Sequence, residues 1–438
     1  MSKRTWGITP VPDRLRTLSA LDFGLLWGNL GISLLILVAG TFLAGLGLAL
    51  GLAAIVVGGL LGTALLGLAG LIGAERRVPG MVLLRDPLGQ RGSYAPTALN
   101  VAQNLGWATF ELIVIAAAAN ALAAEVFGFE ARWLWVLLFG ALTAALALAG
   151  PISFVRRYVR RFAIWAVVAS TVYLTWWALD RVDVGALWSA DGAGGLSFWQ
   201  GVDLTVAMAA SWLPLAADYT RFGRSGRAAF WGTAVGYLVP LVWLYTLGLL
   251  LALSGGFADT TALLTAVAGA GLASALALLA LTVDETDEPF ANVYSAAVSL
   301  QNLVPRVPQA LLIVGCAVLA TAGALAFDLL AYESFLFLLG SFFVPLFGVL
   351  AADFLVGAEA HVAVRWSGLG AWVAGAGLYH WIHPTGPAWW TDAVSHLPGS
   401  GEFTGGASLP SFALAFALYA AVRYVQHATL GRRWAYRG

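Results

Sequence analysis

Charged residues are scarce in this sequence, and cysteine is almost absent. Of its 438 residues, 11% are charged, whereas a soluble domain averages about 25%. The single cysteine, Cys316, excludes a disulfide framework within the chain and a cysteine-rich metal site. Basic and acidic residues number 23 each, so net charge gives no argument for binding to nucleic acid. Because 60% of the residues are hydrophobic, the composition is that of a polytopic membrane protein.

The stretch 23–74 carries no charged residue. As a helix it would be about 78 Å long, which is too long for one crossing of a hydrocarbon core of about 30 Å and enough for two. The preceding segment 1–22 is polar, so we expect no cleavable signal peptide. Small residues recur every four positions in the second half of the stretch, as at Gly58 and Gly62, which predicts close packing against a neighbouring helix.

Apolar runs bounded by charged breaks predict about twelve membrane-spanning helices. They lie near residues 23–45, 50–74, 94–124, 132–150, 162–179, 201–218, 228–254, 271–297, 308–326, 333–356, 367–383 and 409–428. With the N-terminus in the cytoplasm, 21 of the 23 basic residues fall in cytoplasmic segments, and only Arg132 and Arg181 fall outside. Because basic residues are retained on the cytoplasmic side, we expect a multi-pass protein of the cell membrane with both termini cytoplasmic.

Two predicted spans contain helix-breaking residues near their centres. The first includes Trp27-Gly-Asn-Leu-Gly-Ile-Ser33, and the sixth includes Ala210-Ser-Trp-Leu-Pro214. Pro214 has no N–H and clashes with the preceding turn, so we expect helix 6 to open near Ser211. Unpaired backbone at that depth is tolerated only beside protein or a watery cavity, so the two breaks predict a binding site between them.

Five carboxylates lie within predicted spans: Glu111 alone in the run 94–124, and Asp284, Glu285, Asp287 and Glu288 together in one helix. A charge in hydrocarbon costs at least about 2.5–3.5 kcal/mol, so acids kept there indicate function. Asp284, Asp287 and Glu288 share one helix face. Glu285 projects from another face and is given no role. The alternatives are that the four acids of helix 8 are solvated in a water-filled cytoplasmic vestibule and contact no ligand, and that Glu111 is hydrogen-bonded within the bundle and serves packing.

Six short segments occur in a characteristic order along the chain. They are Leu26-Trp-Gly-Asn-Leu-Gly-Ile-Ser33, Pro79-Gly-Met-Val-Leu-Leu-Arg85, Gly106-Trp107, Ser211-Trp212 with Asp218-Tyr-Thr-Arg221, Asn292-Val-Tyr-Ser295, and Pro345-Leu-Phe-Gly-Val-Leu-Ala-Ala-Asp353. With them the sequence, from about Leu21 to Asp353, resembles the nucleobase:cation symporter-1 family of cytosine, purine, hydantoin and related permeases. The stretch Ala98 to Trp107 is most similar to the branch proposed to carry hydroxymethylpyrimidine, a thiamin precursor.

The resemblance implies an all-α, LeuT-like fold, a five-plus-five inverted repeat followed by two extra helices. On this plan residues 1–22 are cytoplasmic, 23–179 form the first repeat, and 201–356 form the second, inverted repeat. Residues 367–428 form the two extra helices, and 429–438 are a cytoplasmic end.

The resemblance also implies the substrate contacts. Family members hold a flat heterocycle between two tryptophans, at positions that match Trp107 and Trp212 here; aromatic pairs are worth about 0.5–1.5 kcal/mol beyond the area that they bury. The other matching positions are Ser33, Glu111, Ser211, Glu288 and Asn292. Glu111 stands where the family usually has an amide. An ionised carboxylate accepts from an amino group, and a protonated one also donates to a ring nitrogen, which favours an aminopyrimidine.

The family sodium site uses backbone carbonyls of helix 1 and hydroxyls of helix 8. These positions match Asn29, Ile32, Val283, Thr286 and Asp287. Asp287 replaces the usual hydroxyl, and a carboxylate there could hold sodium or carry a proton. Apart from this possible sodium ion, we expect no metal and no cofactor.

We therefore expect a secondary active symporter, and no enzyme, that imports a planar aminopyrimidine, in particular hydroxymethylpyrimidine, by alternating access. Its partners would be the heterocycle and the lipid bilayer, with no nucleic acid and no obligate protein partner. The alternatives are a proton-coupled permease for cytosine or another nucleobase, an intramembrane metal enzyme, and a channel. The enzyme would need a nucleophile–base or metal constellation on facing spans. His380, His383 and His396, without a cysteine or an acid pair nearby, are interpreted as surface histidines.

Overall fold

The computed structural model describes residues 8–149, 164–253, 260–327, 332–357 and 362–435. These residues form helices and no β-strand, apart from one isolated bridge between Leu18 and Gly223. Up to residue 179, the described chain contains η1 (Asp13–Leu15), α1 (Ala20–Leu30), α2 (Leu34–Thr41), η2 (Phe42–Leu46), α3 (Gly47–Arg76), α4 (Gly80–Leu83), α5 (Arg85–Leu88), α6 (Tyr94–Phe127), α7 (Arg132–Ala149) and α9 (Ile164–Leu179). The rest contains α10 (Val184–Ser189), α11 (Phe198–Ala210), α12 (Leu213–Thr220), α13 (Gly226–Leu253), α14 (Thr260–Gly269), α15 (Leu272–Asp284), α16 (Asp287–Leu303), α17 (Gln309–Ala326), α18 (Tyr332–Val356), α19 (Trp366–Ile382), α20 (Ala388–Ser395) and α21 (Ser408–Ala435).

Each of the twelve ranges predicted to span the membrane contains helical structure. By length and composition, seven helical stretches of the described chain are apolar enough to cross a membrane. One of them, Leu34–Arg76, joins α2, η2 and α3, yet the chain turns within it at Gly47, whose φ is 73°. The number of crossings and their orientation therefore remain predictions.

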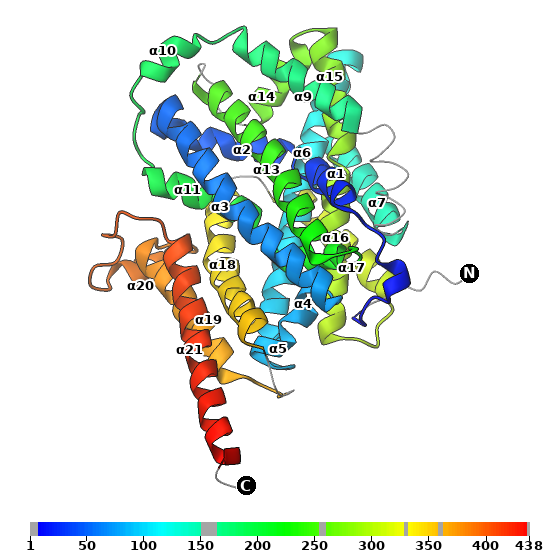
Figure 1. The fold of residues 1–438 in the computed structure, drawn as a ribbon. Helices are drawn as coiled ribbons and strands as arrows, with labels where there is room; N and C mark the ends of the chain where they lie inside the picture. The colour runs from blue at the N-terminus through cyan, green and yellow to red at the C-terminus, as the bar shows by residue number, and fades with distance from the viewer. Residues whose placement is uncertain (1–7, 150–163, 254–259, 328–331, 358–361, 436–438) are drawn as a thin grey trace.

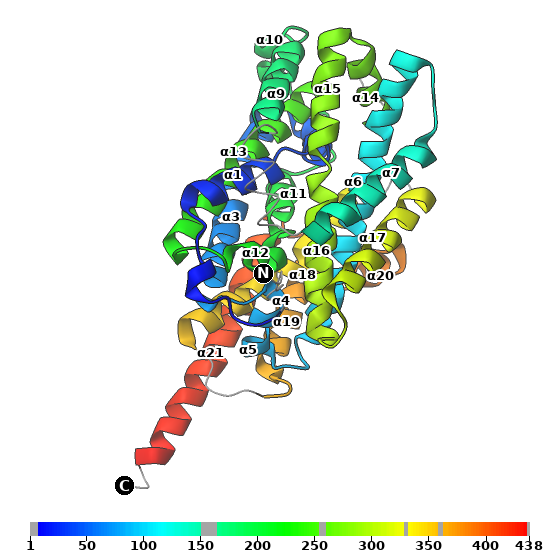
Figure 2. The same cartoon turned by 90° about the vertical axis from the view of Figure 1, so that its right-hand side faces the viewer.

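The helices form two groups and a flanking set (Figure 1). In the first group, which we call the bundle, α3 packs against α11, α12 and α13, while α1 and α2 pack on α13. In the second group, the scaffold, α6, α7, α16 and α17 pack against one another, and Figure 2 shows them side by side. Helices α18, α19 and α21 flank the bundle.

Small residues bring α3 close to its neighbours, as the four-residue spacing predicted. A Cβ added to Gly58 would lie 2.6 Å from the Val202 carbonyl oxygen of α11. A Cβ on Gly62 would lie 2.9 Å from the Ala209 side chain of the same helix. Backbones can approach this closely only where side chains are absent, so the glycines have a packing role.

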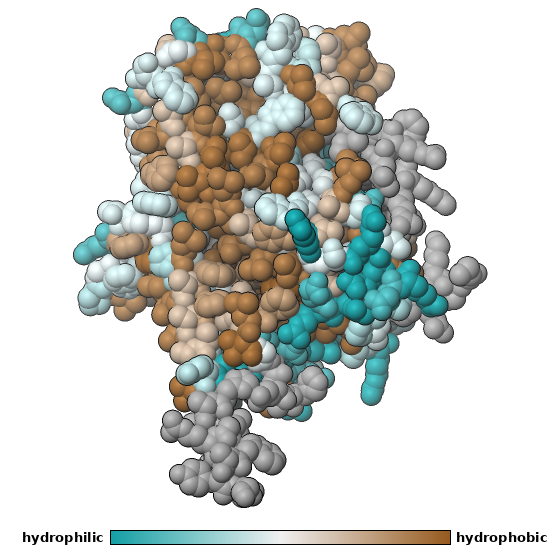
Figure 3. All heavy atoms as spheres, in the orientation of Figure 1, coloured by the Kyte–Doolittle hydropathy of each residue, from teal (hydrophilic) through white to brown (hydrophobic). Residues whose placement is uncertain are grey.

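The outer surface is largely apolar on the face shown in Figure 3, where hydrophilic residues gather toward the lower right. Exposed large side chains include Trp165, Leu272 and Trp366, which are 71%, 78% and 77% exposed. Apolar area of this extent on a helical protein indicates a lipid-facing surface.

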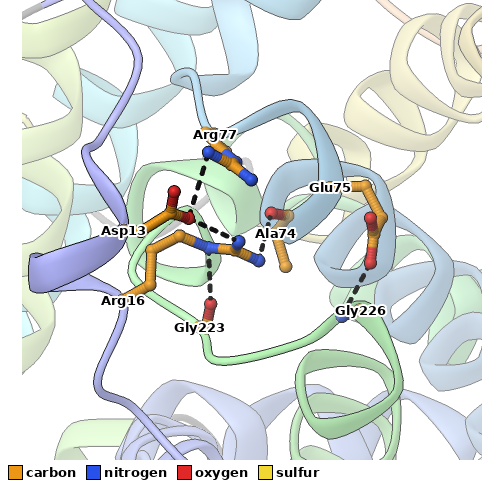
Figure 4. Close-up of polar contacts among 7 residues, drawn as sticks. All are labelled: Asp13, Arg16, Ala74, Glu75, Arg77, Gly223 and Gly226. Atoms are coloured by element: carbon orange, nitrogen blue, oxygen red, sulfur yellow. Dashed lines mark hydrogen bonds and ion pairs between the residues drawn. The ribbon is translucent and has the colours of Figure 1, made fainter.

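The segment before α1 binds the ends of two bundle helices (Figure 4). Arg16 donates from Nε to the Gly223 carbonyl (3.1 Å) and from a terminal nitrogen to the Ala74 carbonyl near the end of α3 (3.2 Å). Asp13 pairs with Arg16 and with Arg77, at 3.2 and 3.1 Å. We call residues 11–18 the N-terminal strap, because it joins the end of α3 to the loop that precedes α13.

Candidate functional site

Three helices are interrupted near the middle of the molecule. Helix α1 ends at Leu30 and α2 begins at Leu34, while α11 ends at Ala210 and α12 begins at Leu213. Both breaks were predicted from the sequence. At the second one, Gln103 of α6 donates to the Ser211 carbonyl at 3.0 Å, so a scaffold side chain satisfies backbone exposed by the break.

The third break was missed, because helix 8 was expected as one span over 271–297. The structure has two helices, α15 and α16, separated by Glu285 and Thr286, and α16 extends to Leu303. The cause is Pro289, which has no N–H to donate to the Glu285 carbonyl four residues earlier. Instead, Glu288 N–H donates to that carbonyl at 3.2 Å, which tightens the helix locally.

The breaks border one pocket. It is lined by Leu30, Ser33, Leu35, Ile36, Trp107, Glu111, Met208, Ser211, Trp212, Tyr237, Glu288 and Asn292. All seven residues predicted to contact substrate are in this set. The structure therefore brings them together from α1/α2, α6, α11/α12 and α16, although their role in binding remains a prediction.

The two tryptophans are held by different partners. The Trp212 ring meets the Trp27 ring edge-on at 5.5 Å, and its Nε1 donates to the Tyr237 hydroxyl at 2.9 Å. The Trp107 ring meets Tyr332 and Phe335 edge-on, at 5.7 and 5.4 Å. Both indoles are 6% exposed. Each ring is therefore fixed by aromatic packing on one side while it lines the pocket, as a stacking surface requires.

Glu111 and Asn292 form a buried pair across α6 and α16. The Asn292 amide nitrogen donates to both Glu111 carboxylate oxygens, at 2.8 and 3.1 Å, and both residues are 2% exposed. It also lies 3.3 Å from the Glu288 carbonyl. With its amide nitrogen committed in this way, Asn292 has its carbonyl oxygen as its remaining polar group.

The Glu111–Asn292 pair belongs to a longer line of polar contacts between α6 and α16, which we call the polar seam. Asn100 donates to the Ser299 hydroxyl at 2.7 Å, and Asn302 donates to Ser93 and Thr97 at 3.0 and 2.8 Å. At the end of the seam, Arg85 Nε donates to the side-chain oxygen of Asn302 at 2.7 Å. Because these buried amides and hydroxyls bond across the two helices, the seam helps to hold the scaffold together.

Glu285 was given no role, and the structure corrects this. Its carboxylate is 1% exposed and accepts from the Ser33 hydroxyl at 2.7 Å and from the Leu34 N–H at 2.9 Å. Glu285 was set aside because it projects from a different face of helix 8 than the other acids. That prediction treated helix 8 as continuous and considered polar partners only in the substrate pocket. The residue instead faces the first turn of α2, so it links the helix 1 break in the bundle to helix 8.

The predicted cation-binding residues lie at this same junction. Asn29 and Ile32 flank the α1 break, where the Asn29 carbonyl accepts from Ile32 N–H at 2.9 Å. The Val283 carbonyl accepts from the Thr286 hydroxyl at 2.7 Å. The side chain of Asp287 lies outside the described residues. Within the described chain, no group of three or more His, Cys, Asp or Glu residues could hold a metal ion, and sodium binding here remains a prediction.

Two segments that carried the family resemblance meet below the pocket. Asp218 of α12 accepts from the Gly80 N–H at the start of α4, at 3.0 Å, and a Cβ at Gly80 would collide with the Pro214 carbonyl. Asp218 is 1% exposed. No pattern in the sequence pairs these segments, in which Asp218 and Gly80 are 138 residues apart.

His380 was interpreted as a surface histidine, and this was wrong. It is 4% exposed, and its Nδ1 accepts from Trp390 Nε1 at 3.1 Å, so α20 covers it. His396 is exposed, as predicted. No short α20 was expected from the sequence, because eight residues of mixed character do not make an apolar run.

Comparison with known proteins identifies the family. The model of a family described as permeases for cytosine and purines, uracil, thiamine and allantoin matches residues 10–367. The chain therefore belongs to this family, as its motifs predicted. A hydantoin permease from Microbacterium maritypicum is 26% identical over 296 residues, which are 63% of this chain and 60% of the relative, so the chain spans less than two thirds of that relative's length.

Solved structures show the fold. A nucleobase-cation-symport-1 family transporter, Mhp1, in a closed conformation with bromovinylhydantoin bound, has a TM-score of 0.72 and 21% identity and covers 97% of this chain and 96% of its own. The inward-facing conformation of the same transporter gives 0.78 and 19%, with 98% and 95% covered. A Na+-coupled sialic acid symporter gives 0.63 and 10%, with 93% and 90% covered. The predicted LeuT-like fold class is thus confirmed.

Proposed function

We propose that this protein is a cation-coupled symporter that imports a planar aminopyrimidine, in particular hydroxymethylpyrimidine, by alternating access. One observation carries the proposal: the buried Glu111–Asn292 pair lies in the same pocket as two fixed indoles. Family membership supports the transport of a flat heterocycle. The indoles offer faces on which such a ring can stack.

The substrate class follows from the acceptors. Glu111 presents a carboxyl in the pocket lining, and carboxylate oxygens accept hydrogen bonds from N–H groups. The Asn292 carbonyl is a second acceptor, and Glu288 supplies another carboxyl in the pocket lining. A ring edge with an exocyclic amino group satisfies such acceptors, whereas uracil has a carbonyl oxygen in place of that amino group, and two acceptors that face each other cost binding free energy. Cytosine has a comparable amino edge and is the second candidate.

The coupling cation would act where the helix 1 break meets helix 8. The α1/α2 break lies in the bundle, and the α15/α16 break lies at the start of the scaffold helix α16. A cation bound between them would therefore favour one relative position of the two groups. We propose sodium as this cation, with a proton as the alternative.

A thermal-shift panel on the purified protein tests the proposal. The ligands are hydroxymethylpyrimidine, cytosine, thiamin, uracil, hypoxanthine and hydantoin, each with and without sodium. Ligand binding to the folded state raises the apparent Tm, by RT ln(1 + [L]/Kd) in free energy. We expect the largest rise with hydroxymethylpyrimidine and a further rise with sodium. A larger response to uracil or hydantoin than to either aminopyrimidine would contradict the proposed substrate class.

A further inference from the structure

Ser33 is the polar residue of the pocket whose hydrogen bonds are most fully determined. Its hydroxyl donates to Glu285 Oε1 at 2.7 Å, and its oxygen accepts from the Leu35 N–H at 3.1 Å. Leu34 N–H donates to the other oxygen of Glu285 at 2.9 Å, which fixes the carboxylate against the first turn of α2. Ser33 is 5% exposed and lines the pocket from the α1/α2 break.

The number of hydrogen bonds that a serine hydroxyl can make fixes whether Ser33 donates to a ligand or accepts from it. A hydroxyl has one proton and two lone pairs. Here the proton is used toward Glu285 and one lone pair toward Leu35, so a single lone pair remains. Toward a ligand, Ser33 can therefore only accept. Both oxygens of the Glu285 carboxyl accept, one from the Ser33 hydroxyl and one from the Leu34 N–H, and this geometry holds the Ser33 proton toward Glu285.

We propose that Glu285 is a positioning residue for substrate specificity, which orients the Ser33 hydroxyl so that the pocket presents only acceptors at this edge. The inference rests on the proposed function and deepens it. Ser33 then offers only a hydrogen-bond acceptor to the ligand, and so does Asn292, because its amide nitrogen donates to Glu111 and only its side-chain carbonyl remains. Substrates are then selected for an amino or hydroxyl donor on the edge that faces α2 as well as on the edge that faces α6, and uracil has a carbonyl oxygen where the aminopyrimidine has its amino group.

The decisive variant is Glu285→Gln, which has nearly the same shape. Leu34 N–H still needs an acceptor, so the new amide oxygen takes that bond and the amide NH₂ faces Ser33. Ser33 must then accept from the amide, and its hydroxyl proton turns toward the pocket. We expect affinity for hydroxymethylpyrimidine to fall about tenfold and affinity for uracil to rise, because one hydrogen bond reverses direction.

A double-mutant cycle separates this role from a structural one. In a Ser33→Ala background, Glu285→Gln should no longer change the ratio of the two affinities, since no hydroxyl is left to reorient. Glu285→Asp, which keeps two acceptor oxygens, should retain the preference for the aminopyrimidine even where binding weakens. It also serves as the informative variant if Glu285→Gln does not fold.

The affinities are measured by titration of purified protein with each ring. An equal loss of affinity for both rings in Glu285→Gln, or an unchanged ratio, would overturn the inference. A shift of the ratio that persists without the Ser33 hydroxyl would do the same. If the wild type binds neither aminopyrimidine, the proposed function fails first; if it prefers them and Glu285→Gln keeps that preference, this inference alone fails.

Discussion

Among single residues, Glu111 is the one on which the proposed selectivity most depends. We expect Glu111→Gln to weaken aminopyrimidine binding by about tenfold, because a charge-assisted hydrogen bond contributes about 1.5–3 kcal/mol and the amide offers a donor where an acceptor is needed. Binding of uracil should improve relative to hydroxymethylpyrimidine. Titration calorimetry on the purified variant measures both. Glu125→Gln, at the exposed end of the same helix, is the matched control and should change neither.

Gly80 is the residue at which close packing is most demanding. A Cβ there would overlap the Pro214 carbonyl beside the α11/α12 break, and α4 would have to move away from α12. Overpacking of this kind costs about 1–3 kcal/mol, so Gly80→Ala should lower the apparent Tm. Gly315→Ala is the control, because a Cβ at Gly315 in α17 meets nothing within 4 Å. A control that loses as much stability as Gly80→Ala would refute the argument from space.

Sequence reasoning found most pocket residues because each carried a signal of its own. Glu111 is a charge in an apolar run, and Trp107 and Trp212 matched positions of a family motif. Glu285 was missed because its partners, Ser33 and Leu34, lie more than 250 residues away, and helix periodicity cannot show which face of one helix meets another helix. Tyr237, which anchors Trp212, carries no signal beyond being an aromatic in an apolar helix.

At the scale of whole elements, the N-terminal strap is expected to hold the ends of α3 and of the α12–α13 loop together. Arg16 binds the Ala74 and Gly223 carbonyls, and carbonyls at a helix end have no intrahelical donor. Arg16→Ala should therefore increase amide hydrogen exchange in residues 74–77 and 223–226, as local opening becomes easier. The measurement is exchange followed by mass spectrometry.

The matched control for the strap is Asp13→Asn. Asp13 contributes exposed ion pairs, with its side chain 76% exposed, and such pairs add little stability. Exchange in the same segments should stay unchanged. If Asp13→Asn had the larger effect, the ion pairs, and not the bonds of Arg16 to carbonyls, would hold the strap.

Helix positions were predictable to within a few residues wherever a long apolar run ended at a charge. The short helices α10, α14 and α20 were not, because elements of six to ten residues leave no periodic pattern long enough to recognise. The break between α15 and α16 could have been anticipated from Pro289. The break follows from the missing N–H of Pro289 and not from the charges of the acids around it.

For the whole molecule, the prediction concerns how cation binding is linked to the two helix groups. Asp287→Asn should abolish the sodium-dependent part of the thermal shift with hydroxymethylpyrimidine, because the variant removes the proposed charged ligand at the junction of bundle and scaffold. Asp284→Asn, at the end of α15 on the other side of the break, is the control and should keep it. Sodium stimulation of normal size in Asp287→Asn would exclude Asp287 as the coupling residue.

The arrangement of the helices could not be read from hydropathy, which gives spans without neighbours. It came from the family resemblance, and the solved transporters confirm it. Physical reasoning from the sequence supplied the two breaks and the site between them. Contacts such as Asp218 to Gly80 needed the structure, since they join backbone to side chain across 138 residues.

The polar seam has a consequence for how the protein is made. Asn100 and Glu111 of α6 find their partners on α16, 199 and 181 residues later in the chain. Until that helix leaves the ribosome, α6 would expose amides and a carboxylate to lipid, where such groups are costly. Helix α6 must therefore be sheltered during biosynthesis, by the insertion machinery or by temporary neighbours, and it cannot complete these contacts before α16 has been translated.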